Sequence, residues 1–211
     1  MIAHRAGNDL DALRRAEALG VDLVEADVRL YRRRAVVRHL KTLGPIPLYW
    51  DRWALASPFR RFPSVEDLVR HADERSELML DLKGPRRRLA ELVLEDLRPV
   101  LGARPLTVCA RSWRLLSTFE SLPVRRIASA GSRRELRALL AAFAELRLDG
   151  VSVHERLLDE TTFADIRRVT ELVLTWPANL PARARALVEL GVDGLISDRP
   201  DAIAPALARA E

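Results

Sequence analysis

Short apolar runs, many rich in β-branched residues, alternate along the chain with amphipathic segments. Strands are predicted at residues 2–5, 21–29, 78–83, 106–110, 126–128, 150–154, 172–176 and 194–197. Helices are predicted at residues 10–19, 64–72, 86–100, 113–122, 132–146, 160–169, 182–190 and 201–210. In the first of these helices Leu10, Leu13, Ala16 and Leu19 share one face, and Gly20 ends it. The pattern therefore predicts eight successive strand–helix units.

Eight such units within 211 residues favour a (β/α)₈ TIM barrel that forms a single domain over residues 1–211. An open doubly wound sheet is the alternative, but residues 4–9, after the first strand, contain no glycine-rich phosphate loop. Residues 35–39 can pair back on the second strand. The least regular stretch, 41–63, is expected to form a long loop or a small cap over the barrel mouth.

Composition and charge narrow the class of protein. The chain is 48% apolar, which is enough for one sizeable core, yet no apolar run is long enough to span a membrane. A predicted strand directly follows Met1, so we expect no signal peptide and a cytoplasmic protein. The single Cys109 excludes an intramolecular disulfide and is expected in the core.

The net charge of +5 is spread along the chain, with arginine runs only at residues 32–34 and 86–88. These runs motivate a nucleic-acid-binding role, but no zinc-finger, RNA-recognition or helix-turn-helix motif accompanies them. We therefore expect no nucleic-acid partner. The sequence does not indicate the oligomeric state.

Polar residues occur where several predicted strands end, and in a barrel the carboxyl ends of all strands meet at one mouth. Glu25 and Asp27 are two residues apart, so both carboxylates face the same side of a strand. Asp81 and Lys83 have the same spacing on the next predicted barrel strand. The remaining members of this set are His4, Arg5 and His39.

These residue types suit the chemistry of a phosphate ester. Glu25, Asp27 and Asp81 would together favour a hard divalent cation, Mg²⁺ or Ca²⁺, which neutralises phosphate charge. Two further residues, His4 and His39, could act as general acid and base, because an imidazole titrates near neutral pH. Arg5 and Lys83 could hold the phosphate oxygens.

Four other residues lie at or next to the ends of predicted strands, and their expected roles are less specific. His154 could line the substrate pocket or lie in the core or rim, and Trp176 could stack on a substrate or pack in the core. Asp193 and Asp198 are expected to hold the last turn of the barrel rather than a metal.

Several motifs resemble the glycerophosphodiester phosphodiesterase family, in family order from residue 2 to residue 200. IAHR at 2–5 is similar to the family's opening (I/V)AHRG, and GVDLVEADV at 20–28 to GxDx(I/V)ExDV. VVRH at 36–39 is similar to VVxHD, and LDLK at 80–83 to IEIK. SW at 112–113, WPAN at 176–179 and GVDGLISDRP at 191–200 resemble SF, WTVN and GVDGIITDxP.

This resemblance implies a (β/α)₈ barrel that cleaves a glycerophosphodiester, or a lysophospholipid-like diester, to glycerol 3-phosphate and an alcohol. It implies a divalent cation on Glu25, Asp27 and Asp81, with His4 and His39 as acid and base. It also implies that Arg5 and Lys83 bind the phosphate of a small-molecule substrate.

The chain departs from the family pattern at several of these positions. Ala6 replaces a glycine, residues 7–9 lack the glutamate of a Glu-Asn-Thr motif, Leu40 replaces an aspartate, and Asp81 replaces a glutamate. The alternative hypothesis is therefore a barrel that binds a phosphorylated metabolite or partner without turnover.

Overall fold

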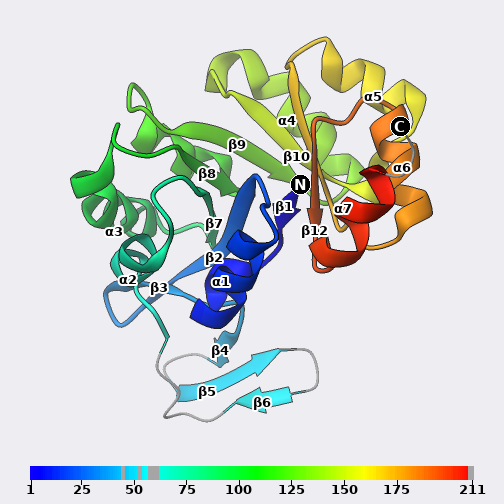
Figure 1. The fold of residues 1–211 in the computed structure, drawn as a ribbon. Coiled ribbons are helices and arrows are strands. Elements are labelled where there is room, and N and C mark those ends of the chain that lie inside the picture. Colours follow the sequence, from blue (N-terminus) through cyan, green and yellow to red (C-terminus); the bar gives the residue numbers. More distant parts are fainter. Residues whose placement is uncertain (44–45, 52–53, 57–61, 209–211) are drawn as a thin grey trace.

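The computed structural model describes residues 1–43, 46–51, 54–56 and 62–208, and the side chains of 41–61 are outside the description. Eight parallel strands close a barrel in the order β1-β2-β7-β8-β9-β10-β11-β12, with β12 pairing back on β1 (Figure 1). Their bounds are β1 Ile2–Ala3, β2 Leu23–Tyr31, β7 Glu77–Lys83, β8 Leu106–Ala110, β9 Arg125–Ala130, β10 Gly150–His154, β11 Leu172–Trp176 and β12 Gly194–Ser197. The TIM-barrel prediction is confirmed.

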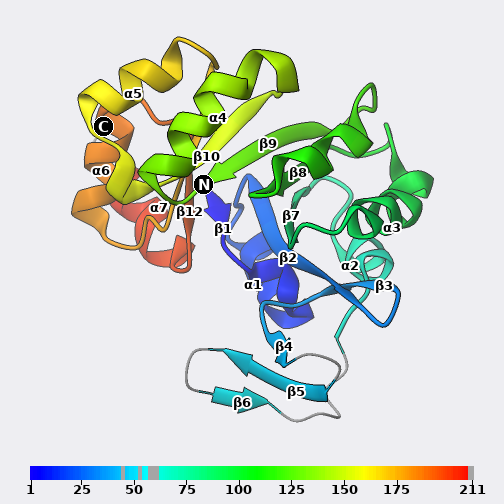
Figure 2. The ribbon, with the colours of Figure 1, turned by 180° about the vertical axis from the view of Figure 1, so that it is seen from behind.

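Helices follow the strands and surround the barrel (Figure 2). They are α1 Leu10–Ala18, α2 Val65–His71, α3 Arg87–Leu97, α4 Arg133–Leu146, α5 Glu160–Arg167, α6 Pro181–Glu189 and α7 Pro200–Ala208. Short 3₁₀ helices are η1 Ala6–Asn8, η2 Arg98–Val100, η3 Trp113–Phe119 and η4 Glu155–Leu157.

Two predicted α-helices are wrong in part. The segment 86–100 ends as α-helix at Leu97 and continues as η2, because Pro99 has no N–H to donate. The segment 113–122 forms only the 3₁₀ helix η3, in which the Ser117 hydroxyl donates to the carbonyl of Arg114 and so competes with α-helical bonding.

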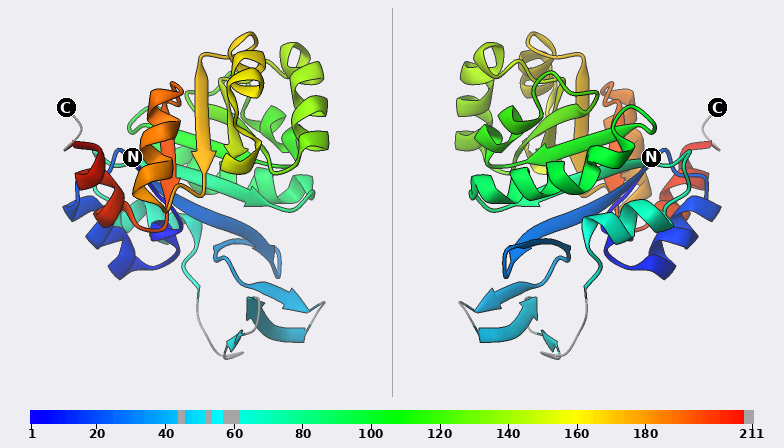
Figure 3. Two further views of the ribbon diagram at one scale, coloured as in Figure 1. Left: turned by 90° about the vertical axis from the view of Figure 1, so that its right-hand side faces the viewer. Right: turned by 90° about the vertical axis from the view of Figure 1, so that its left-hand side faces the viewer.

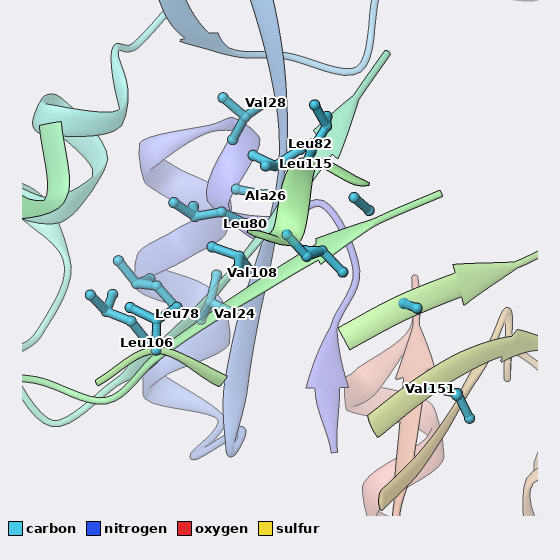
Figure 4. Packing of buried hydrophobic residues seen from close by; sticks show 14 of the residues in the cluster. Val24, Ala26, Val28, Leu78, Leu80, Leu82, Leu106, Val108, Leu115 and Val151 are labelled. Atoms are coloured by element: carbon cyan, nitrogen blue, oxygen red, sulfur yellow. The ribbon is translucent and has the colours of Figure 1, made fainter. Parts of the chain in front are cut away.

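Alternation along the strands separates two environments. On β2, Val24, Ala26 and Val28 are fully buried, and Figure 4 shows them packed with Leu78, Leu80 and Leu82 of β7. The residues between them, such as Glu25 and Asp27, point to the other side, into the barrel. A second cluster fills the barrel interior, formed by Ile2, Met79, Cys109, Ile127, Leu174 and Ile196. Cys109 is thus a core residue, as predicted.

The segment after β2 departs most from prediction. Strand β3, Arg34–Val37, pairs antiparallel with β2, which confirms the expected pairing. The stretch predicted as a loop contains three antiparallel strands: β4 Lys41–Leu43, β5 Ile46–Asp51 and β6 Ala54–Ala56. This small sheet projects from the barrel (Figure 3). Its expected role as a cap rests on side chains outside the described residues and stays a prediction.

Within the described part of the chain, the helices are too short or too polar to cross a lipid bilayer.

Candidate active site

Three carboxylates converge inside the barrel where β2 pairs with β7, two from the first half and middle of β2 and one from near the carboxyl end of β7. Asp27 lies opposite Asp81 in the strand register, and Glu25 lies two residues earlier on β2. One oxygen from each of the three residues lies within 4.8 Å of the others. Glu25 is 2% exposed and Asp27 is fully buried. The structure therefore brings together the three predicted metal ligands.

The loop after β1 fixes two of these carboxylates. Arg5 has a left-handed backbone, with φ of 58°, and its amide N–H donates to Glu25 Oε2 at 2.6 Å. Asn8 makes two bonds to Asp27: its Nδ2 donates to Oδ2 at 2.9 Å, and its Oδ1 accepts from the Asp27 amide at 2.8 Å. Gly7 allows this approach, since a Cβ there would lie 2.7 Å from Ala26 Cβ.

The imidazole of His39 and the cationic side chains of Lys83 and Arg5 contact the same carboxylate cluster. His39 Nδ1 lies 3.0 Å from Asp27 Oδ2, and Lys83 Nζ lies 2.8 Å from Asp27 Oδ1 while also contacting Asp81. The Arg5 Nε is 3.7 Å from Asp27 Oδ2. Asp27 is therefore the centre of the network.

His4 reaches the cluster from β1, which it directly follows. Strand β1 pairs with β2 on the side away from β7. The His4 Nδ1 lies 2.7 Å from Asp198 Oδ1, and its Nε2 lies 3.9 Å from Glu25 Oε2. Asp198 follows β12 and accepts a second hydrogen bond from Asn179 Nδ2 at 2.8 Å. Asn179 Oδ1 in turn accepts from the Ser197 hydroxyl at 2.9 Å and from the Asp198 amide at 2.8 Å. This chain of bonds orients one imidazole nitrogen toward Asp198 and the other toward the carboxylates.

The contacts of His4 also set its titration. Burial opposes protonation of the imidazole, but the hydrogen bond to Asp198 and the charge of Glu25 outweigh it, so the pKa of His4 is raised. The same hydrogen bond lowers the pKa of Asp198 to about 2. Asp198 thus stays ionised and available to hold the imidazole.

The pKa values of Glu25 and Asp27 are shifted in opposite directions. Burial and the neighbouring charge of Asp27 raise the pKa of Glu25 to about 7. Burial acts in the same direction on Asp27, but the His39 hydrogen bond and the Lys83 charge outweigh it and lower its pKa. Burial would lower the pKa of Lys83, yet Asp81 and Asp27 raise it. Without a cation, the cluster therefore keeps Asp27 charged and disfavours the charge of Glu25.

Some buried oxygens of the cluster lack a hydrogen-bond partner among the described residues. They include Glu25 Oε1 and Asp81 Oδ1. Such groups are costly unless another species contacts them. An all-oxygen donor set with unpaired buried atoms suits a hard divalent cation, so the residues present fit the implied metal.

The two remaining predicted residues lie on the other side of the barrel from β2. His154 and Trp176 are opposite each other on β10 and β11, and their rings meet edge to face with centroids 4.7 Å apart. Trp176 also packs on the interior cluster, and burial lowers the pKa of His154. His154 and Trp176 thus form a ring pair of their own on β10 and β11, and their predicted role in the substrate pocket stays a prediction.

No protein-family model and no curated protein matches the chain. Its fold is similar to several solved structures. An Oleispira antarctica phosphodiesterase, solved in complex with the product sn-glycerol-3-phosphate, has a TM-score of 0.79 and 20% identity, covering 98% of this chain and 96% of that one. The chain has the fold of the glycerophosphodiester phosphodiesterases. A glycerophosphodiester phosphodiesterase from Thermotoga maritima has a TM-score of 0.76 and 20% identity, covering 97% and 96%.

A glycerophosphodiester phosphodiesterase from Parabacteroides distasonis gives a TM-score of 0.79 at 18% identity and covers 100% of this chain and 97% of that one. At identities this low, the similarity to the glycerophosphodiester phosphodiesterases establishes the shared fold alone.

Sequence reasoning missed three polar residues of this site. Asn8 belongs to an incomplete motif in the sequence, and the structure shows that it fixes Asp27. Asp198 is predicted to hold the last turn of the barrel, and it also contacts His4. Asn179, which holds Asp198, has no role predicted from the sequence. The position of Asp198 directly after the last strand is a usable signal, because that strand pairs with the first one.

Proposed function

We propose that the chain is a divergent glycerophosphodiester phosphodiesterase. It would hydrolyse a glycerophosphodiester, or a lysophospholipid-like diester, to glycerol 3-phosphate or a related phosphomonoester and an alcohol. The observation that carries this proposal is the contact network that joins His4 and His39 to the carboxylates of Glu25 and Asp27. The fold of the solved phosphodiesterases supports it.

The proposed metal ligands are Glu25, Asp27 and Asp81. When bound there, Mg²⁺ or Ca²⁺ would neutralise charge on the phosphate and on its transition state. Arg5 and Lys83, which already lie against the cluster, would hold the non-bridging phosphate oxygens. The substrate phosphate would thus replace part of their present contact with Asp27.

The two imidazoles divide the proton transfers. One accepts the proton of the attacking hydroxyl or water, and the other donates a proton to the leaving alcohol oxygen as the P–O bond breaks. Asp198 holds His4 and Asp27 holds His39, so a carboxylate fixes the orientation of each ring. His154 and Trp176 would line the pocket for the rest of the substrate, where the ring pair offers an apolar surface.

A barrel that binds a phosphate ester without turnover is the second candidate. The contacts of the Lys83 ammonium with Asp27 and Asp81 favour it, because an ammonium neutralises part of the cluster without a metal. This candidate predicts binding of phosphate esters but no product with any cation.

The variants His4→Ala and His39→Ala test the proposed function. Each is expected to abolish glycerol 3-phosphate release while leaving the circular dichroism spectrum unchanged, since neither ring belongs to the apolar core. Wild-type turnover in both variants would contradict the assignment of acid and base. Absence of turnover in the wild-type protein, together with measurable phosphate-ester binding, would favour the second candidate.

A further inference from the structure

A cavity of about 710 Å³ lies beside the barrel mouth, between the segments that follow β8 and β9. Among the described residues that line it, the basic ones are Arg111, Arg114 and Arg134, and the acidic one is Glu135. Trp113 and Leu115 contribute apolar surface. None of these residues belongs to the carboxylate cluster or its network.

Arg111 connects this cavity to the mouth. It is two residues beyond Cys109, which lies in the barrel interior opposite Asp81 in the strand register. Arg111 directly follows β8, which pairs with β7, the strand that holds Asp81. A Cβ on Gly131 would lie 2.9 Å from Arg111 Nη2 and 3.4 Å from Trp176 Cη2, so both side chains approach the same point of the mouth.

The cavity keeps a positive charge. Arg111 Nη2 donates to both carboxylate oxygens of Glu135 at 2.6 Å, and Glu135 also accepts from the Gly131 amide at 2.8 Å. Arg114 and Arg134 are exposed, and within the described ranges neither forms an ion pair with a carboxylate. Two guanidinium charges are therefore available to a ligand.

Two apolar lining residues, Trp113 and Leu115, are fixed in place. The Trp113 indole N–H donates to the carbonyl of Ser129 on β9 at 2.9 Å, and Leu115 is buried. The arginines therefore line a hollow whose apolar side is held by these contacts.

We propose that this cavity binds a phosphate group on the leaving alcohol, so that the substrate is a glycerophosphodiester whose alcohol carries a second phosphate. This inference rests on the proposed function. Guanidinium groups bind phosphate with paired, charge-assisted hydrogen bonds. The same charges disfavour a cationic head group, which gives selectivity by repulsion as well as attraction.

The test compares two substrates that differ by one phosphate: glycerophosphoinositol 4-phosphate and glycerophosphoinositol. The measured quantity is the ratio of their kcat/KM values. The wild-type protein is expected to prefer the phosphorylated substrate. The double variant Arg114→Gln/Arg134→Gln is expected to lower the ratio about threefold to tenfold, as for two exposed charge contacts. The effect should weaken with added salt.

The matched control is Arg133→Gln/Arg137→Gln, which removes the same charge from exposed positions of α4 that do not line the cavity. It is expected to keep the wild-type ratio. An equal fall in both double variants, or a wild-type ratio near one, would overturn the proposal.

A binding measurement separates this proposal from the proposed function. If no diester is cleaved with any cation, the proposed function fails, and calorimetry with inositol 1,4-bisphosphate and inositol 1-phosphate still tests the cavity. Tighter binding of the bisphosphate, lost in Arg114→Gln/Arg134→Gln, supports it. Equal affinity for the two probes overturns it.

Discussion

Replacing Glu25 by glutamine tests the electrostatics of the carboxylate cluster. In the metal-free protein, burial and the charge of Asp27 raise the pKa of Glu25 from 4.5 to about 7. Below pH 4.5 the folded and unfolded states both hold the proton, so the carboxyl has no effect on stability through titration. Above pH 7 both have lost it, and the buried charge costs roughly 3 kcal/mol. Stability of the metal-free protein should therefore fall as pH rises between these values.

Glu25→Gln removes this charge and retains an oxygen that can accept from the Arg5 amide. In urea unfolding with EDTA at pH 8, the variant should be more stable than wild type by up to roughly 3 kcal/mol, with little difference at pH 4.5. Added Mg²⁺ or Ca²⁺ should stabilise the wild-type protein and should have little effect on the stability of the variant. A variant that is less stable than wild type at pH 8 in EDTA would refute this reasoning.

Three further predictions concern separate parts of the molecule. Asp198→Asn should lower kcat about 10²- to 10⁴-fold by releasing His4, with KM little changed; equal kcat would contradict its positioning role. Gly7→Ala should cost about 1–3 kcal/mol of unfolding free energy, since its Cβ would lie 2.7 Å from that of Ala26; an unchanged melting temperature would argue against it. Burial and nearby carboxylates raise the pKa of Asp96 to about 6. Urea unfolding should therefore show that Asp96→Asn stabilises the fold by about 1 kcal/mol at pH 8, a value reduced for solvent screening, and has no effect at pH 4.

Most of the barrel could be predicted because its strands are buried and short. The runs at 106–110, 150–154, 172–176 and 194–197 form strands with the predicted bounds. The first strand is shorter than expected, because Arg5 turns into a left-handed conformation that directs its amide to Glu25. This contact joins residues far apart in sequence and leaves no local signal.

The small sheet after β3 was harder to predict. Pro47 argues against a strand, since proline cannot donate to a ladder. In the structure it follows Ile46, in the part of the β4–β5 ladder where the register shifts, and there a missing donor is tolerated.

The candidate site followed from period-two spacing on single strands. Glu25 with Asp27, and Asp81 with Lys83, had to share a face once the strands were assigned. The contact between His4 and Asp198 spans 194 residues and exists because β12 closes the barrel on β1. Side-chain partners across a closure of this kind require the three-dimensional structure.

The most direct test of the proposed activity is the release of glycerol 3-phosphate from a panel of glycerophosphodiesters and lysophospholipids. It would be measured with Mg²⁺, Ca²⁺, Mn²⁺ and EDTA, beside a Glu25→Ala variant. We predict cation-dependent release that EDTA abolishes and that the variant lacks. Release that persists in EDTA and in Glu25→Ala, or no release from any substrate, would contradict a metal-dependent phosphodiesterase built on this cluster.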